Sequence, residues 1–150
     1  MSVTPTSIPP SDHLGLTTRF LVTIDGFRLG GWAKCDGLAV QFDLYTYKPL
    51  GHNDYVPVLP NRLIYPNITL TRAITKESAP TVIEWLSKMA GKGAGATAEI
   101  TLLDAHRDKV TSWKLKGVYP VKWKGPTLDA GSHAIATETL ELAHEGFLDV

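Results

Sequence analysis

The sequence predicts a mainly β protein, an antiparallel β-sandwich or barrel with one α-helix, and three observations support this prediction. Apolar and polar residues alternate in most segments between residues 19 and 147, which is the period of a half-buried strand. Only one segment, about residues 78–90, shows helical spacing. The 150 residues, of which 43% are hydrophobic, suit a single domain with its own core.

The chain begins with a segment rich in proline, serine and threonine. Proline fixes φ and removes a backbone donor, so we expect residues 1–18 to form an extended N-terminal arm. The rest, residues 19–150, would be one β domain. The first residues show neither the basic start nor the apolar stretch of a secretory signal.

The first strands are predicted directly after this arm. Residues 20–24 alternate in polarity, and the Asp25-Gly26 pair indicates a tight turn into a second strand over 27–34. Residues 38–47 alternate as well, which predicts a long half-buried strand. Its inward side chains would be Leu38, Val40, Phe42 and Leu44.

A long loop is predicted next. Residues 48–63 contain three prolines and no period, and loops of about sixteen residues in a small domain tend to be functional. The loop would lead into a strand over 65–73, with Ile68 and Leu70 facing the core.

The single helix is expected from about residue 78 to residue 90. Ser78 suits its N-cap, and Pro80 falls in the first turn, where a missing N–H costs nothing. Gly91 follows its end, as glycine often does. The buried face would consist of Val82, Ile83, Leu86, Met89 and Ala90, with Trp85 at its edge.

Alternation at a period of two returns after the helix. Further strands are predicted near residues 97–102, 109–119, 121–124 and 136–144, which makes seven or so in all. The DAHRDK stretch between the first two of these indicates a hairpin loop.

We find no residue pattern that is typical of an enzyme. The five histidines lie singly, without the spacing of metal ligands, and Cys35 has no second cysteine. The glycines of GKGAG follow the helix, whereas a phosphate site needs them before a helix N-terminus. The sequence therefore predicts no catalytic residue, no cofactor and no metal. A net charge of zero argues against sequence-specific binding of nucleic acid.

Four motifs carry a resemblance to a known family. They are FLVTIDG at 20–26, LPNRLIYPNITLTRAIT at 59–75, PVKWKGP at 120–126 and ETLELAHEG at 138–146. In this order and spacing the chain resembles the tail tube (inner tube) proteins of contractile phage tails and phage-derived contractile injection systems, over about residues 19–147. It departs from the usual family pattern at Asn61, at Ala73 and in the segment YTYKPLGHNDY.

The resemblance implies a structural subunit without an active site. Such subunits close into hexameric rings, and the rings stack into a tube whose lumen conducts effector cargo or a genome when a surrounding sheath contracts. The implied partners are the sheath protein, together with baseplate or tube-initiator and cap proteins at the ends of the tube. The resemblance also implies assembly in the bacterial cytoplasm, as part of a phage tail or of an injection particle, released or retained.

Six residues around the long loop are the predicted subunit contacts. They are Asp43, Tyr45, Tyr47, His52, Tyr55 and Arg62. Aromatic and arginine side chains beside an irregular loop are typical of interfaces. In the alternative interpretation, the tyrosines cover an additional sheet face within the monomer.

Two other functions remain open from the sequence. A baseplate tube-initiator protein would share the fold and several motifs. A soluble β-sandwich could instead recognise sugar or peptide through Trp32, Trp113 and Trp123, and exposed, coplanar tryptophans on one face would favour this function.

Overall fold

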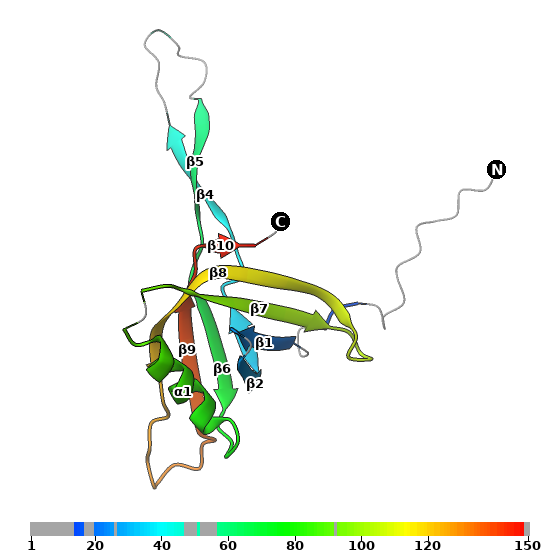
Figure 1. Ribbon diagram of the computed structural model, residues 1–150, viewed down its shortest axis with the longest axis vertical. Coiled ribbons are helices and arrows are strands. Elements are labelled where there is room, and N and C mark those ends of the chain that lie inside the picture. Colours follow the sequence, from blue (N-terminus) through cyan, green and yellow to red (C-terminus); the bar gives the residue numbers. More distant parts are fainter. Residues whose placement is uncertain are drawn as a thin grey trace, which may run out of the picture.

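The computed structural model describes residues 14–16, 20–25, 27–46, 51, 57–91 and 93–148. Within these ranges the fold is mainly β, with antiparallel sheets and one helix, as the sequence predicts (Figure 1). The elements are β1 Phe20–Ile24, β2 Phe27–Gly31, β3 Lys34–Asp36, β4 Gln41–Thr46, β5 Val58–Ile64, β6 Ile68–Ala73, α1 Ala79–Met89, β7 Ala96–Leu103, β8 Lys109–Lys124, β9 Thr137–Ala143 and β10 Gly146–Phe147.

Strand β8 connects the two halves of the main sheet. Its first half pairs with β7 and its second half with β9, and the strand order is β2-β1-β7-β8-β9-β6-β3. The prediction of two separate strands here was wrong, because β8 continues through Pro120 with a register shift instead of ending there. In Figure 1, β8 curves across the whole body.

The two ends of this strand order lie next to each other in the sequence. Only Trp32 and Ala33 separate β2 from β3, and the Ala33 N–H donates to the carbonyl of Thr71 on β6. The main sheet therefore curls round towards a barrel. At the start of the described chain, the Leu16 N–H donates to the Leu103 carbonyl at the end of β7; most of the predicted arm lies outside the described residues.

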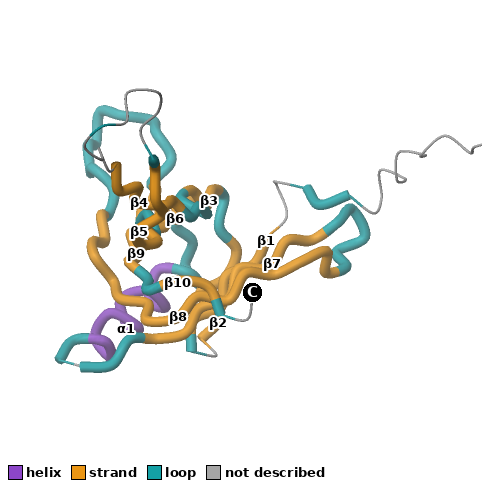
Figure 2. Tube along the Cα trace, turned by 90° about the horizontal axis from the view of Figure 1, so that it is seen from above, coloured by secondary structure: helices purple, strands orange, loops and turns teal. Residues whose placement is uncertain are grey.

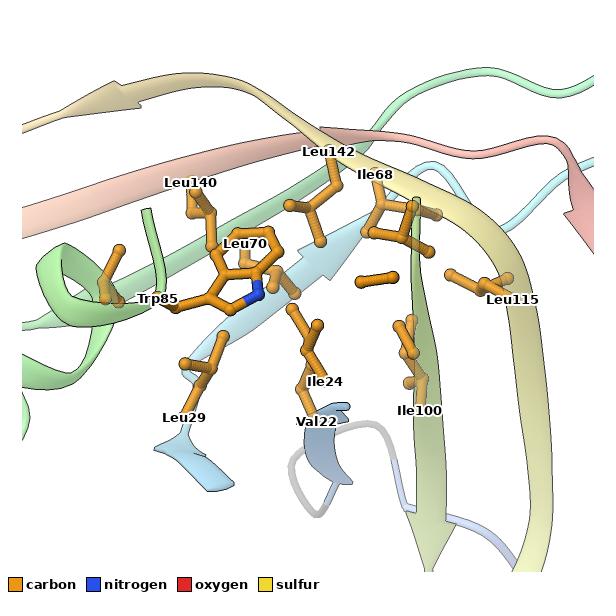
Figure 3. Close-up of a cluster of buried hydrophobic side chains, with 14 of the residues drawn as sticks. Val22, Ile24, Leu29, Ile68, Leu70, Trp85, Ile100, Leu115, Leu140 and Leu142 are labelled. Carbon is orange, nitrogen blue, oxygen red and sulfur yellow. The ribbon is translucent and has the colours of Figure 1, made fainter. Parts of the chain in front are cut away.

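The core lies between the curled halves of the sheet (Figure 3). Strands β1, β6, β7, β8 and β9 each point apolar side chains into it, and Ile68 and Leu70 are buried as predicted. Its largest fully buried apolar side chains are Trp85, Ile24, Leu29, Ile68, Leu70, Leu115, Leu140 and Leu142.

The helix is placed as predicted, but its buried face is different. Trp85 is buried among the core side chains in Figure 3, whereas Ile83 and Ala90 are exposed. An indole removes more apolar area from water than the smaller side chains beside it, so the helix turns Trp85 inward. Ser78 occupies the N-cap position, yet its hydroxyl bonds to Thr75 and not to the helix. Among the described residues, no helix has the length and apolar character that a membrane span requires.

Strands β4 and β5 form a separate two-stranded antiparallel ribbon that projects from the body (Figure 1). The view from above in Figure 2 shows the β7 hairpin end extending away from this ribbon. Residues 58–63 were predicted as part of a loop, and this was wrong, because they pair with β4 as most of β5. Phe42 and Leu44 were predicted to face the core, which was also wrong, because both are more than half exposed.

Candidate assembly surfaces

The register of the ribbon separates its side chains onto two faces. Residues that pair directly across two antiparallel strands share a face. Phe42 pairs with Leu63 and Asp43 with Arg62, and a register shift follows. We call the first face the apolar ribbon face, which carries Phe42, Leu44, Thr46, Val58, Pro60 and Leu63. We call the second the mixed ribbon face, which carries Gln41, Asp43, Tyr45, Leu59, Arg62 and Ile64.

The apolar ribbon face has no cover within the described chain. Phe42 is 57% exposed and Leu44 is 58% exposed. A two-stranded ribbon is marginally stable on its own, and exposed apolar patches of this kind mark protein interaction sites. Alternation in β4 was therefore identified correctly from the sequence, but its apolar side chains stay exposed in the described subunit.

The mixed ribbon face brings together three of the six predicted contact residues. Arg62 Nε lies 3.4 Å from Asp43 Oδ2, and the Arg62 side chain is largely exposed whereas that of Asp43 is partly buried. Tyr45 lies on the same face and is also exposed, so it does not cover another sheet face within the subunit. Tyr47, His52 and Tyr55 lie outside the described residues.

Inside the subunit, two of the sequence motifs meet at a buried ion pair. Arg72 on β6 is 3% exposed, and its Nε donates to Glu138 Oε1 on β9 at 2.6 Å. The guanidinium lies 4.1 Å from the ring centre of Trp32, and Trp123 Nε1 donates to Glu138 Oε2 at 3.1 Å. Both charges are thus paired and hydrogen-bonded, as buried charges must be.

Arg72 also joins the sheet to the helix. It donates to the carbonyl of Leu29 on β2, to the carbonyl of Ser78 at 3.1 Å and to the Thr81 hydroxyl at 3.3 Å. The motifs contained Arg72 and Glu138, but sequence reasoning assigned neither a role. The sequence could have indicated this pair. Arg72 and Glu138 occupy the same alternating positions as the inward residues Leu70 and Leu140, so two opposite charges are expected inside the core.

A second contact between motifs lies where β5 of the ribbon joins the body of the subunit. Tyr65 follows β5 directly, and its ring lies 5.3 Å from His144 and 5.7 Å from Phe147 between ring centres. Gly146 has φ +137°, and a Cβ there would lie 3.0 Å from the Tyr65 ring, so a side chain would be strained and would crowd that ring. Burial lowers the pKa of His144, and backbone groups of Gly146 and Pro66 partly oppose this effect.

The tryptophans do not form a binding face. Trp32 is buried beneath Arg72, and Trp113 is half-buried against the core. Trp123 uses its indole N–H on Glu138. Three exposed, coplanar tryptophans, which would favour a sugar- or peptide-binding module, are therefore not found, because Trp32 is 5% exposed.

Similarities to known proteins agree with this architecture. The family described as "T4-like virus tail tube protein gp19" matches residues 16–148 of the chain. Among curated proteins, none matches the chain in sequence.

Three solved structures show the same fold. One is a chain in the 6-fold symmetrised structure of the anti-feeding prophage (AFP) baseplate, with a TM-score of 0.76, 23% identity and coverage of 95% of this chain and 96% of that chain. A chain in the sheath-tube complex of the extracellular contractile injection system PVC has a TM-score of 0.77 and 18% identity, with coverage of 91% of each chain. A chain in the AFP tube-terminating cap has a TM-score of 0.76 and 21% identity, with coverage of 99% of this chain and 94% of that chain.

Proposed function

The chain belongs to the T4-like tail tube protein family, and from that premise we propose that its copies close into hexameric rings that stack into the inner tube of a phage tail or contractile injection system. The family expected from the four motifs is confirmed. Its members are structural tube proteins, so the function of this chain is that of a structural tube subunit.

The observation that carries self-association into a tube is the uncovered apolar ribbon face. Burying apolar area is worth about 25 cal/mol per Å², so a projecting ribbon with this face exposed favours association. A contact between two different surfaces closes into a ring or continues as an open stack, depending on its rotation. Six subunits per ring is our inference from the sixfold symmetry applied to the AFP baseplate.

We also propose that the ribbon provides contacts between subunits through its mixed face. Asp43, Tyr45 and Arg62 lie together there, and the predicted contacts Tyr47, His52 and Tyr55 belong to the segment between β4 and β5. An aromatic ring beside an exposed arginine is a typical interface anchor.

The lumen is assigned to the outer face of the β3-β6-β9-β8 half of the sheet. Inward side chains such as Leu70 and Leu140 fill the core, so the residues between them face outward. We call this the threonine face, and its polar residues are Lys34, Asp36, Thr69, Thr71, Lys122, Lys124, Thr137, Thr139 and Glu141. Its polar character suits a water-filled channel, and its nearly balanced charge lets effector cargo or a genome pass without strong attraction.

The partners follow from what resembles this chain. One similar structure is a sheath-tube complex and another is a tube-terminating cap, so we infer a contractile sheath around this tube and cap or baseplate proteins at its ends. The PVC particle is an extracellular injection system. By the same inference, the tube assembles in the bacterial cytoplasm and can leave the cell within its particle.

Electron microscopy of the purified chain tests this function. We expect rings and stacked tubes at high protein concentration, alone or with co-expressed neighbours. Monomers under both conditions would contradict the proposal. Rings that form only on a baseplate template would favour a tube initiator instead.

Thiol labelling of assembled tubes tests the lumen. In a Cys35→Ser background, Thr139→Cys should react with a small maleimide but not with a maleimide on a carrier wider than the lumen. Ser87→Cys, exposed on α1, is the matched control and should react with both. Labelling of Thr139→Cys by the large reagent in intact tubes would place the threonine face outside the lumen.

A further inference from the structure

The loop between β8 and β9, residues 125–136, carries the most exposed large apolar side chains of the described chain. Leu128 is 86% exposed and Ile135 is 79% exposed. The loop lies at the opposite end of the molecule from the ribbon, along its longest axis (Figure 1). The described chain therefore has an uncovered apolar surface at each end.

The backbone of this loop is held by hydrogen bonds. Asp129 Oδ1 accepts from the Gly131 N–H at 3.0 Å, and the Asp129 carbonyl accepts from the Ser132 N–H at 3.1 Å. The Ser132 hydroxyl accepts from the Ala134 N–H at 3.3 Å. Such turns, in which an Asp or Ser side chain bonds to nearby backbone, fix the path of a loop. Leu128 and Ile135, which flank this turn, are thus presented at defined positions.

Both ends of the loop are attached to the body. The Ala136 carbonyl accepts from the Ile74 N–H, just after β6, at 3.0 Å. At the other end, a Cβ on Gly125 would lie 2.9 Å from the Trp123 ring, so the chain passes close to that ring. The two apolar side chains therefore keep their place relative to the sheet, which a recognition surface requires.

We propose that Leu128 and Ile135 of one copy pack against the apolar ribbon face of the copy in the next ring. This inference rests on the proposed tube and names the contact that stacks it. Two different surfaces at opposite ends of a subunit make a head-to-tail contact, which repeats without closing. A tube of rings needs such a contact along its axis, and a ring alone leaves both surfaces in water.

The charges at the two surfaces permit this contact. On the described ribbon, Asp43 and Arg62 pair with each other and lie on the mixed ribbon face. The loop carries only Asp129 and His133 as ionisable residues. Contact between the apolar sides therefore brings no like charges together, and apolar burial is its main driving force.

A double variant of the full chain, Leu128→Asp with Ile135→Asp, tests the contact. Rings should still form, but the protein concentration needed for stacking should rise at least about a hundredfold, as measured by electron microscopy and sedimentation. Ile83→Asp places the same charge on an exposed apolar residue of α1 and should stack normally. Tubes from the double variant at the wild-type concentration would overturn the inference.

Cross-linking identifies the partner directly and does not depend on variants that prevent assembly. In a Cys35→Ser background, Phe42→Cys with Leu128→Cys should give disulfide-linked ladders of many chains in oxidised tubes and only single chains in separated rings. Ladders in separated rings would mean that the loop meets the ribbon within a ring, which would overturn the inference. Failure of the wild-type chain to form rings at all would contradict the proposed function instead.

Discussion

Arg72 and Glu138 face each other across β6 and β9, with 2.6 Å between Arg72 Nε and Glu138 Oε1 inside the core. Around this pair, Arg72 holds β2 and the start of α1, and Trp123 on β8 bonds to the other carboxylate oxygen. Two motifs that identify the family thus meet at a contact that holds the subunit together. They specify the fold from which the tube is built.

Breaking this ion pair should destabilise the subunit strongly. Arg72→Met leaves the Glu138 carboxylate buried without its cation, and we expect the free energy of unfolding to fall by about 3–5 kcal/mol. Urea unfolding followed by tryptophan fluorescence measures this loss. Arg72→Met with Glu138→Leu removes both charges and should lose less than the two single variants added together. Additive losses would show that the two residues are not coupled.

Charging the apolar ribbon face should separate folding from assembly. Leu44→Asp changes an exposed residue, so the free energy of unfolding of the subunit should stay within about 0.5 kcal/mol of wild type. Tubes should nevertheless be lost in electron micrographs, because a neighbouring copy would have to bury the charge. Thr46→Asp, toward the outer end of the same face, should weaken assembly less. A Leu44→Asp chain that forms normal tubes would show that this face stays in water.

The strands that bury their apolar side chains within the subunit could be predicted from the sequence. The exposure of the apolar side chains on the ribbon could not. In β6 and β9, alternation indicated the strands, and in β6 it also indicated the core face, because Leu70 is buried by this same chain. In β4 the same alternation predicted a core contact for Phe42, but this side chain is 57% exposed in the subunit. Alternation along a strand shows that one of its faces is apolar, but it does not show what covers that face.

Two other differences have local causes. β5 lacks a period because a register shift interrupts its pairing with β4 near Pro60, and a pattern search treats such a segment as a loop. On α1, counting apolar positions placed Trp85 at the edge, whereas the large area of its indole places it in the core.

Stability of the subunit should fall in mild acid because of His144. Burial lowers its pKa in the folded state below the ordinary value of 6.5, so the unfolded chain binds its proton first as the pH falls. The favourable contribution of the neutral ring is present above pH 6.5 and is lost as the pH falls towards the folded pKa. Each unit of lowering is worth about 1.4 kcal/mol. Urea unfolding at pH 7.5 and 5.5 should show this decrease, and His144→Phe should reduce it. An equal decrease in the variant would assign the effect to other groups.

The thiol of Cys35 should be unreactive in the folded subunit. Burial, with a further contribution from the Asp36 charge, raises its pKa from 9.0 to about 11. Near pH 8 this leaves about a hundredfold less thiolate, the reactive form, than an ordinary cysteine has. Mass spectrometry after iodoacetamide treatment should show slow alkylation in buffer and fast alkylation in urea. Fast alkylation of the folded subunit would contradict the raised pKa that partial burial gives this thiol.

The central claim is that the apolar ribbon face is buried by another copy of the same chain. Cryo-electron microscopy of assembled tubes, at a resolution that shows side chains, tests it most directly. We expect Phe42, Leu44 and Leu63 to be covered by a neighbouring subunit in every ring between the two ends of the tube. Tubes in which these side chains face the lumen or the solvent would contradict it.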